Sequence, residues 1–326
     1  MILLPRRSAV RRCGRRPARQ RGVILLSALI ITAMAAVVAA ALFFDAGLLA
    51  RRSAANFGLE QALAIGQGAE ALAAQALRDD EGQTDTPQDT WAQQVEPVEL
   101  DAGIVLEAKL NDLSGRFNLN SLVNANGERN ENAMRVFRRL LELADLETRW
   151  ADMVADWIDP DTQPLPDGGE DGLYQMQRPA HRTANMAITG TSELLQMPGF
   201  TQEMYLKLSP HITALPATAR TINVCMADGV VLDALFALHQ TDQNHEEYSR
   251  LTAEELEERR QGGCYPQRSV LTSGQQPMQQ MSVERTTWFR LETWVTIGTA
   301  QFALYSLMQR EGSGQVRTVA RSLGSE

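Results

Sequence analysis

The first pattern in the chain is an uninterrupted apolar run near its start. Residues 23–44 contain twenty-two positions without a charged side chain. At about 1.5 Å of rise per residue, a helix of this length reaches roughly 33 Å, and the hydrocarbon core of a membrane is about 30 Å thick. Apolar residues continue at helical spacing as far as Leu77, with no proline between Val23 and Pro87. The pattern predicts one helix of roughly 80 Å, half inside a membrane and half outside it.

Alternating apolar and polar positions predict strands in two separate parts of the chain. Residues 103–110 alternate in this way and 116–122 follow after a turn, so these two segments are expected to pair as a hairpin. A second β-prone block covers 288–297, 300–308 and 316–323. Between the two blocks, helical patterns cover 132–144, 148–158, 191–196, 201–208 and 230–238.

These elements predict an α+β fold in which a long N-terminal transmembrane helix packs on an antiparallel sheet. Strands at both ends of the head indicate one sheet, interrupted by a large, all-helical inserted subdomain. The expected segments are a leader over 1–22, the long helix over 23–78, the first part of the sheet domain over 79–123, the inserted helical domain over 124–281 and the C-terminal strands over 282–326.

The residues before the apolar run are strongly basic. Eight arginines and no acidic residue precede Val23, and such a leader stays on the cytoplasmic side of a membrane. An ordinary secretory signal has a shorter apolar core, and its cleavage site follows that core. Here Gln20, Arg21 and Gly22 precede the run, which resembles the processing site of type IV pilin-like precursors, where a membrane peptidase cuts after glycine. A plain signal anchor with an accidental glycine is the alternative.

The charge and the cysteine content of the sequence indicate that the globular head lies outside the cytoplasm. The formal charge of the protein is −9, and loss of the eight leader arginines changes it to about −17. So acidic a head disfavours nucleic acid and anionic lipid as partners. Cys13 would leave with the leader, and the remaining Cys225 and Cys264 predict a disulfide in an oxidising compartment. Two buried, unpaired thiols are the alternative.

Several short motifs occur in the order that is found in one known family. They are the junction Arg21-Gly22-Val23, residues 112–120 (DLSGRFNLN), the acidic loop that begins Asp156-Trp157-Ile158-Asp159, then Ser192-Glu193-Leu194, Gly199-Phe200 before Tyr205, and Ile222-Asn223-Val224. Over nearly its whole length the sequence resembles the minor pseudopilins of the GspK type, from the bacterial type II secretion system. The resemblance implies a pilin-like sheet, a helical insertion and no enzymatic activity. Cys225 and Met226 depart from the asparagine and threonine that are usual in the family.

The resemblance also implies a function and a location. A protein of this type is a single-pass protein of the bacterial inner membrane, with a cytoplasmic N-terminus and a periplasmic head. It is processed after Gly22 by prepilin peptidase, caps the tip of the periplasmic pseudopilus and supports export of folded proteins across the outer membrane. The implied partners are the minor pseudopilins of types I, J and H, the major pseudopilin, prepilin peptidase, the inner-membrane assembly platform and secreted substrates.

The fifth residue after the expected cleavage point is Ser27. Major pilins and pseudopilins carry a glutamate there, and its carboxylate can neutralise the N-terminal amine of the neighbouring subunit. An ammonium buried without that partner is costly at low dielectric. The resemblance therefore implies that a subunit with Ser27 sits at the tip, with no other subunit above it. The alternative is that Ser27 is a small residue that the helix tolerates.

The loop over 156–174 concentrates acidic residues among prolines and glycines. Such carboxylates repel one another, but they can converge on Ca²⁺, which takes about six to eight oxygen ligands. The prolines exclude an EF-hand. The helical domain of GspK-type proteins resembles that of calcium-binding proteins. This resemblance favours a structural Ca²⁺ site in the loop over a solvated acidic turn. The expected ligands are Asp159, Asp161, Asp167, Glu170 and Asp171.

Catalytic patterns in the sequence are poor. The segment 190–194 (GTSEL) lacks the second glycine of a nucleophile elbow, and the histidines are scattered. Two other functions stay open at this point: a minor subunit of a type IV pilus, and a signal-anchored periplasmic enzyme. The helical insertion argues for the secretion system, and a cleaved leader with a retained apolar helix argues against the enzyme.

Overall fold

The structure is a computed structural model that describes residues 21–80, 82–101, 103–124, 126–239, 247–272 and 275–324. The protein divides into two compact units, residues 1–60 and residues 61–326. Helix α1 (Arg21–Asp79) begins in the first unit and ends in the second, which contains every other described element. The first twenty residues of the expected leader, with Cys13, lie outside the described residues.

Helix α1 is continuous over 59 residues, which confirms the long helix that the apolar pattern predicts. Among the described residues it is the one helix that is long and apolar enough to cross a membrane, and none of its apolar window is buried inside the protein. From Val23 to Phe44 its large apolar side chains are exposed. This part of α1 requires lipid or other apolar helices around it.

From Gln61 onward, α1 packs on a sheet through small residues. Ala69, Ala74 and Leu77 are buried there together with Phe289 and Met308 of the sheet. A Cβ added at Gly66 would lie 2.6 Å from the Leu304 side chain. A larger residue at that position would force the end of the Leu304 side chain to shift, so the absent side chain at Gly66 lets α1 lie directly against Leu304.

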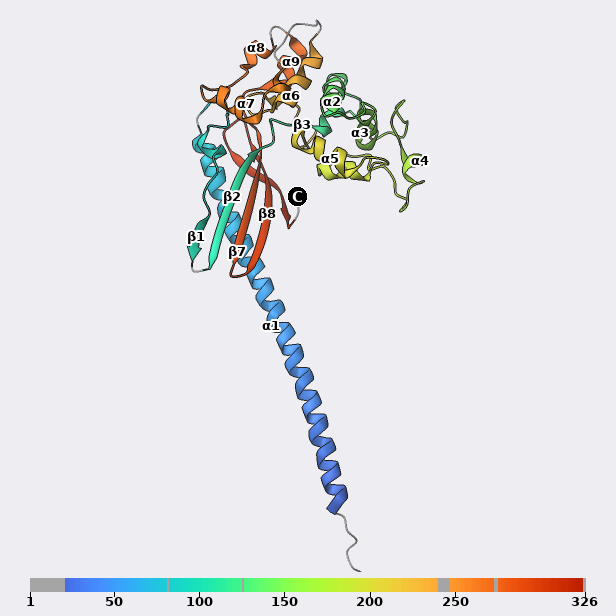
Figure 1. The fold of residues 1–326 in the computed structure, drawn as a ribbon, viewed down its shortest axis with the longest axis vertical. Helices are drawn as coiled ribbons and strands as arrows, with labels where there is room; N and C mark the ends of the chain where they lie inside the picture. Colours follow the sequence, from blue (N-terminus) through green and yellow to red (C-terminus); the bar gives the residue numbers. More distant parts are fainter. Residues whose placement is uncertain are drawn as a thin grey trace, which may run out of the picture. The chain divides into compact units, whose positions relative to one another are not determined.

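The sheet has five strands in the order β1-β2-β7-β8-β9, and all neighbouring strands are antiparallel. The strands are β1 (Val98–Asp101), β2 (Ile104–Asp112), β7 (Trp288–Ile297), β8 (Ala300–Arg310) and β9 (Val316–Leu323). Strand β2 pairs with β7 along its whole length. The prediction that both ends of the head form one sheet is therefore confirmed (Figure 1).

Two details of the strand prediction are wrong. Residues 116–122 do not form a hairpin with β2; Phe117–Asn118 is the short strand β3, parallel to β4 (Ile212–Thr213), and Leu119–Leu122 is a 3-10 helix. The reason is that Phe117, Leu119 and Leu122 are fully buried in the core of the helical region rather than along one face of a sheet. Strand β1 lies outside the segments predicted as strands; its apolar and polar residues alternate, but over only four positions, all of them exposed.

Helices are the main regular elements between β2 and β7, and every predicted helical segment in this region is helical. It contains α2 (Glu131–Leu143), α3 (Trp150–Ile158), α4 (Asp171–Tyr174), α5 (Gln202–Leu208), α6 (Gly229–Leu235), α7 (Ala253–Arg260), α8 (Arg268–Thr272) and α9 (Gln276–Met281). Residues Thr191–Gln196 form the 3-10 helix η3, and β5 (Ile222–Asn223) pairs in parallel with β6 (Ser282–Val283). Helices α2 to α5 lie to one side of the sheet, and α7 to α9 gather at its end (Figure 1).

The helical region has a large core of its own, built around aromatic pairs. The Phe117 and Phe137 rings stack with centroids 5.3 Å apart, and Trp150 and Phe200 meet edge to face at 5.0 Å. Such pairs contribute about 0.5–1.5 kcal/mol each beyond their burial. This core holds the ends of α3 and η3 in fixed positions, and both elements border the sites described below.

Glu70 is a buried carboxylate at the contact between α1 and the sheet. Its oxygens accept two hydrogen bonds of 2.7 Å from Arg321, one of 2.6 Å from Ser306 and one of 3.1 Å from Thr318. Burial raises the pKa of Glu70, but the hydrogen bonds from Arg321 and Ser306 outweigh this effect and hold the pKa below its ordinary value. One acid therefore joins α1 to β8 and β9.

We expect Glu70→Gln to lower the free energy of unfolding by about 1–3 kcal/mol, because it removes charge-assisted hydrogen bonds from a buried group. Since the pKa of Glu70 is depressed in the folded state, this contribution is fully present above the ordinary value of 4.5 and is lost as the pH falls further. Denaturant unfolding of the full-length protein in detergent, at neutral pH and at about pH 3, measures the effect.

The matched control is Glu60→Gln, because Glu60 is an exposed acid on the same helix. It should leave the unfolding free energy within about 0.5 kcal/mol of the original. Equal losses in the two variants, or a Glu70→Gln effect that stays undiminished in acid, would contradict a stabilising role for the ionised carboxylate.

Candidate functional site

The acidic loop begins at the end of α3, whose last turn fixes two carboxylates. Asp156 is fully buried, and Asp159, which follows the last helical residue, is 5% exposed. Asp156 Oδ2 accepts a 2.9 Å hydrogen bond from the Leu165 backbone amide. This bond draws the proline-rich part of the loop back against α3.

Three of the expected ligands come together in the structure. Asp159, Asp161 and Glu170 each offer a carboxylate oxygen, and these oxygens lie within 4.8 Å of one another. Asp159 and Glu170 are buried whereas Asp161 is exposed, so the cluster is open to solvent on one side. We call these three residues the carboxylate cluster.

Several oxygen atoms at and beside the carboxylate cluster are buried without a donor. Among the described residues, Asp156 Oδ1, Asp159 Oδ1 and Glu170 Oε1 have no hydrogen-bond partner. Burying a hydrogen-bond acceptor away from water costs free energy unless a donor or a cation binds to it. A hard divalent cation such as Ca²⁺ takes oxygen ligands of this kind, so the residues present fit such an ion.

The electrostatics of these groups also favour a positive charge nearby. The pKa of Glu170 is raised to about 7, mainly by burial, with a further contribution from the charges of Asp156, Asp159 and Asp161 and an opposing one from the hydrogen bond of Thr183. Burial likewise raises the pKa of Asp156 to about 6. Close carboxylates cannot all ionise without compensation, and a cation would restore their charged forms.

The other two expected ligands lie apart from the carboxylate cluster. Asp167 is exposed, and no described contact brings it to the other three. Asp171 Oδ1 accepts hydrogen bonds from the Thr183 backbone amide and hydroxyl, at 3.1 and 3.0 Å, and its other oxygen lies 3.7 Å from Arg182. Sequence reasoning did not select Asp156 as a ligand, although its spacing of three from Asp159 placed both on one side of α3.

A glycine allows the loop to pass close to the buried Asp156. A Cβ added at Gly168 would lie 2.0 Å from Asp156 Oδ2, well inside the contact distance. Asp156 is fixed by its hydrogen bond to Leu165, so it cannot move away without breaking that bond. The loop conformation that presents Glu170 therefore depends on the absent side chain at Gly168.

Cys225 and Cys264 form a disulfide, with their Cα atoms 4.7 Å apart and a sequence separation of 39. Cys225 is fully buried, and its backbone amide donates to Asn223 Oδ1 at 3.0 Å. The bond ties the segment before α6 to the segment after α7. A crosslink over a loop of this length restricts the unfolded polypeptide, which corresponds to about 2–4 kcal/mol in the entropic model.

The residues of the expected processing site lie at the start of α1. Gly22 and Val23 are both helical. Four residues further on, the exposed Ser27 donates its hydroxyl to the Ile24 carbonyl at 3.0 Å. Ser27 therefore satisfies its own polar group within the helix and brings no charge into the apolar segment.

An apolar N-terminal helix that continues into a sheet-packed half, with a helical insertion in the sheet, defines a pseudopilin. A family profile described as type II secretion system (T2SS), protein K, matches residues 115–217. Type II secretion system protein K of Pseudomonas aeruginosa is 31% identical, over 94% of this chain and 93% of its own. The Pectobacterium carotovorum protein of the same name is 30% identical, over 94% and 97%. The chain belongs to the type II secretion system protein K family, whose members are structural, non-enzymatic pseudopilins.

A solved structure shows the same fold. One polypeptide of the crystal structure of the GspK-GspI-GspJ complex from enterotoxigenic Escherichia coli matches with a TM-score of 0.66. The two are 22% identical, and the match covers 84% of this chain and all of the other. Family membership confirms the resemblance inferred from the motifs, and it favours the secretion system over a type IV pilus or an anchored enzyme.

We expect Gly168→Ala to destabilise the loop and to lower the free energy of unfolding by about 1–3 kcal/mol, through overpacking against Asp156. The control is Gly172→Ala in the adjacent α4, where an added Cβ meets nothing within 4 Å. Thermal unfolding of both variants measures the difference. Equal stability of the two variants would show that the close approach at Gly168 does not constrain the loop.

Proposed function

We propose that this protein is the minor pseudopilin that caps the tip of a type II secretion pseudopilus. In this function it is processed after Gly22 by prepilin peptidase and supports export of folded proteins across the outer membrane. The observation that carries the proposal is Ser27, an uncharged residue at the fifth position of an exposed apolar helix in a member of the protein K family.

The tip position is inferred from the charge on the N-terminal amine of each subunit. In a bundle of apolar helices, a free ammonium needs a carboxylate nearby, because an unpaired charge is costly at low dielectric. Ser27 offers no carboxylate, and its hydroxyl is already hydrogen-bonded to Ile24. This subunit is therefore poorly suited to lie below another pilin amine, and a position with no subunit above it avoids that cost.

The same function implies a topology and a set of partners. The arginine-rich leader stays in the cytoplasm, α1 spans the inner membrane and the acidic head lies in the periplasm. The similar Escherichia coli structure is a complex of GspK with GspI and GspJ. By analogy we assign this protein to a tip complex with minor pseudopilins of types I, J and H, above the major pseudopilin and the inner-membrane assembly platform, where secreted substrates can reach it.

We further propose that the carboxylate cluster holds a structural Ca²⁺ ion. Asp159, Asp161 and Glu170 would supply ligands. The buried Asp156 interacts electrostatically with Asp159 and Glu170, so its charge would add to the attraction for the ion. The ion would neutralise repelling carboxylates and fix the loop between α3 and α4. Its role is to order the head, and it has no part in any chemical reaction.

Ser27→Glu is expected to reduce secretion roughly tenfold or more, because an unpaired carboxylate at membrane depth costs about 2.5–3.5 kcal/mol. The assay measures a secreted type II substrate in the medium of cells that lack their own protein K and express this one instead. Ser27→Ala is the matched control and should secrete like the original. Full secretion by Ser27→Glu would remove the support that Ser27 gives to a tip position.

We expect Ca²⁺ to raise the thermal unfolding temperature of the full-length protein by about 5 °C at saturation, compared with the protein in a chelator. Glu170→Gln should abolish most of this increase, because it removes a buried ligand. Asp167→Asn is the control, since Asp167 is an exposed acid of the same loop outside the carboxylate cluster. Identical unfolding temperatures with Ca²⁺ and with chelator would refute the ion but leave the tip assignment standing.

A further inference from the structure

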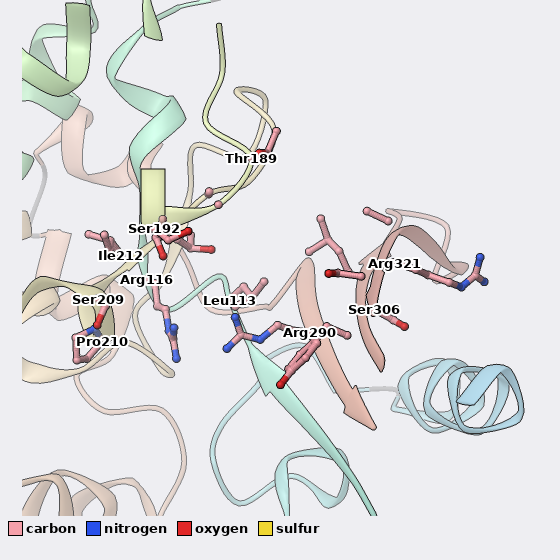
Figure 2. A pocket seen from close by; sticks show the side chains of 18 of the residues that line it. Leu113, Arg116, Thr189, Ser192, Ser209, Pro210, Ile212, Arg290, Ser306 and Arg321 are labelled. Atoms are coloured by element: carbon pink, nitrogen blue, oxygen red, sulfur yellow. The ribbon is translucent and has the colours of Figure 1, made fainter. Parts of the chain in front are cut away.

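A cavity of about 430 Å³ lies between the sheet and the helical region, away from the carboxylate cluster. One wall comes from the turn after β2 and from β7, β8 and β9, and the other comes from η3, α5 and the segment 209–214 (Figure 2). Pockets that bind small ligands or short peptide segments have volumes of about 300–1,000 Å³. The cavity is therefore large enough for more than a single ion.

The charges that line this cavity are all positive. Its lining residues include three arginines, Arg116, Arg290 and Arg321, and no aspartate or glutamate. This composition is unusual in a protein whose formal charge is −9. Arg321 is held by Glu70 and points away from the other two in Figure 2, so the charge inside the cavity comes from Arg116 and Arg290.

Figure 2 shows Arg116 and Arg290 pointing toward one another across the cavity. The Arg290 side chain is 16% exposed and forms a 3.0 Å ion pair with Glu292. Burial lowers the pKa of Arg290, Glu292 raises it, and the nearby charge of Arg116 lowers it again. Within the described residues no hydrogen bond or ion pair holds the Arg116 guanidinium. Two cations thus lie near one another. Glu292 forms an ion pair with Arg290, whereas Asp112 acts on Arg116 only through its charge, so the donors of the Arg116 guanidinium remain available to a ligand.

The rest of the lining is suited to a polypeptide rather than to a bare anion. The lining contains both hydroxyl groups, from Ser192, Tyr205 and Ser209, and apolar side chains, from Leu113 and Ile212. An extended segment offers both apolar and hydrogen-bonding groups to such a wall. An inorganic anion would contact the arginines and leave most of the cavity to water.

We propose that this cavity binds a carboxylate of another polypeptide, either an acidic side chain or the C-terminal carboxylate, between Arg116 and Arg290. The planar guanidinium group presents paired donors that match the two oxygens of a carboxylate. An anion placed there would also relieve the repulsion between the two arginines. This binding site is separate from the proposed tip function. Binding of a peptide to it can be measured on the isolated protein, whether or not the protein caps a pseudopilus.

The test is fluorescence anisotropy with the purified full-length protein in detergent micelles. The probes are peptides labelled at the N-terminus with the uncharged dansyl group. Their sequences are Gly-Ser-Glu-Gly and Gly-Ser-Gln-Gly, both amidated at the C-terminus, and Gly-Ser-Gln-Gly with a free C-terminal carboxylate. We expect both carboxylate-bearing peptides to bind about tenfold more tightly than the amidated glutamine peptide, which is the contribution of one charge-assisted pair. Arg116→Gln should remove this preference.

Arg317→Gln is the matched control, because Arg317 is an exposed arginine of β9 that does not line the cavity. It should keep the preference for carboxylate. A second variant, Ser192→Glu, keeps both arginines and places an internal carboxylate at the cavity wall, so it should compete with the peptides and weaken their binding about tenfold.

Three results would overturn the proposal. The first is equal binding of the glutamate and glutamine peptides, and the second is an equal loss of preference in Arg116→Gln and Arg317→Gln. The third comes from inorganic phosphate, used as a competitor and as a ligand in its own right. Phosphate that binds in an Arg116-dependent manner while no peptide binds would show a simple anion site instead of a polypeptide site.

Discussion

The fold depends on how closely the second half of α1 can approach the sheet. Gly66 and the buried alanines allow the helix to lie against Leu304, and Glu70 then reaches Ser306, Thr318 and Arg321 on β8 and β9. Without this contact, the apolar face of the sheet and the second half of α1 would both be left in water. The contact also links the helix that carries the apolar N-terminal run with strands from the C-terminal part of the protein.

The pairing of β2 with β7 explains why the helical region is an insertion. Strands β2 and β7 pair along their full length, so the polypeptide leaves the sheet at Asp112 and returns to it at Trp288 from nearly the same place. The intervening residues build a separate core around Trp150 and Phe137. Leu215 from the middle of the insertion also packs against Trp288 of the sheet. Such an insertion can carry the carboxylate cluster without disturbing the contact between α1 and the sheet.

Elements with a strong local signal could be predicted from the sequence, and elements set by distant contacts could not. The apolar run predicted α1, and alternation predicted β2, β7, β8 and β9. The supposed hairpin over 116–122 was wrong because Phe117 and Leu119 pack into a core formed by residues far away in sequence. In the acidic loop, composition predicted five ligands, but only Asp159, Asp161 and Glu170 come together. Composition could not separate these three from Asp167 and Asp171, because which carboxylates converge depends on the turn at Gly168. The arginines of the cavity come from separate elements, so no sequence motif joins them.

The central claim is that this protein enters the secretion system as a processed pseudopilin whose mature helix begins with its apolar run. The N-terminal sequence and the intact mass of the protein, isolated from membranes with and without prepilin peptidase, test this claim most directly. The account predicts a start at Val23 only when the peptidase is present, with the eight leader arginines and Cys13 removed. A start at Met1 under both conditions would contradict it and would leave an unprocessed membrane anchor.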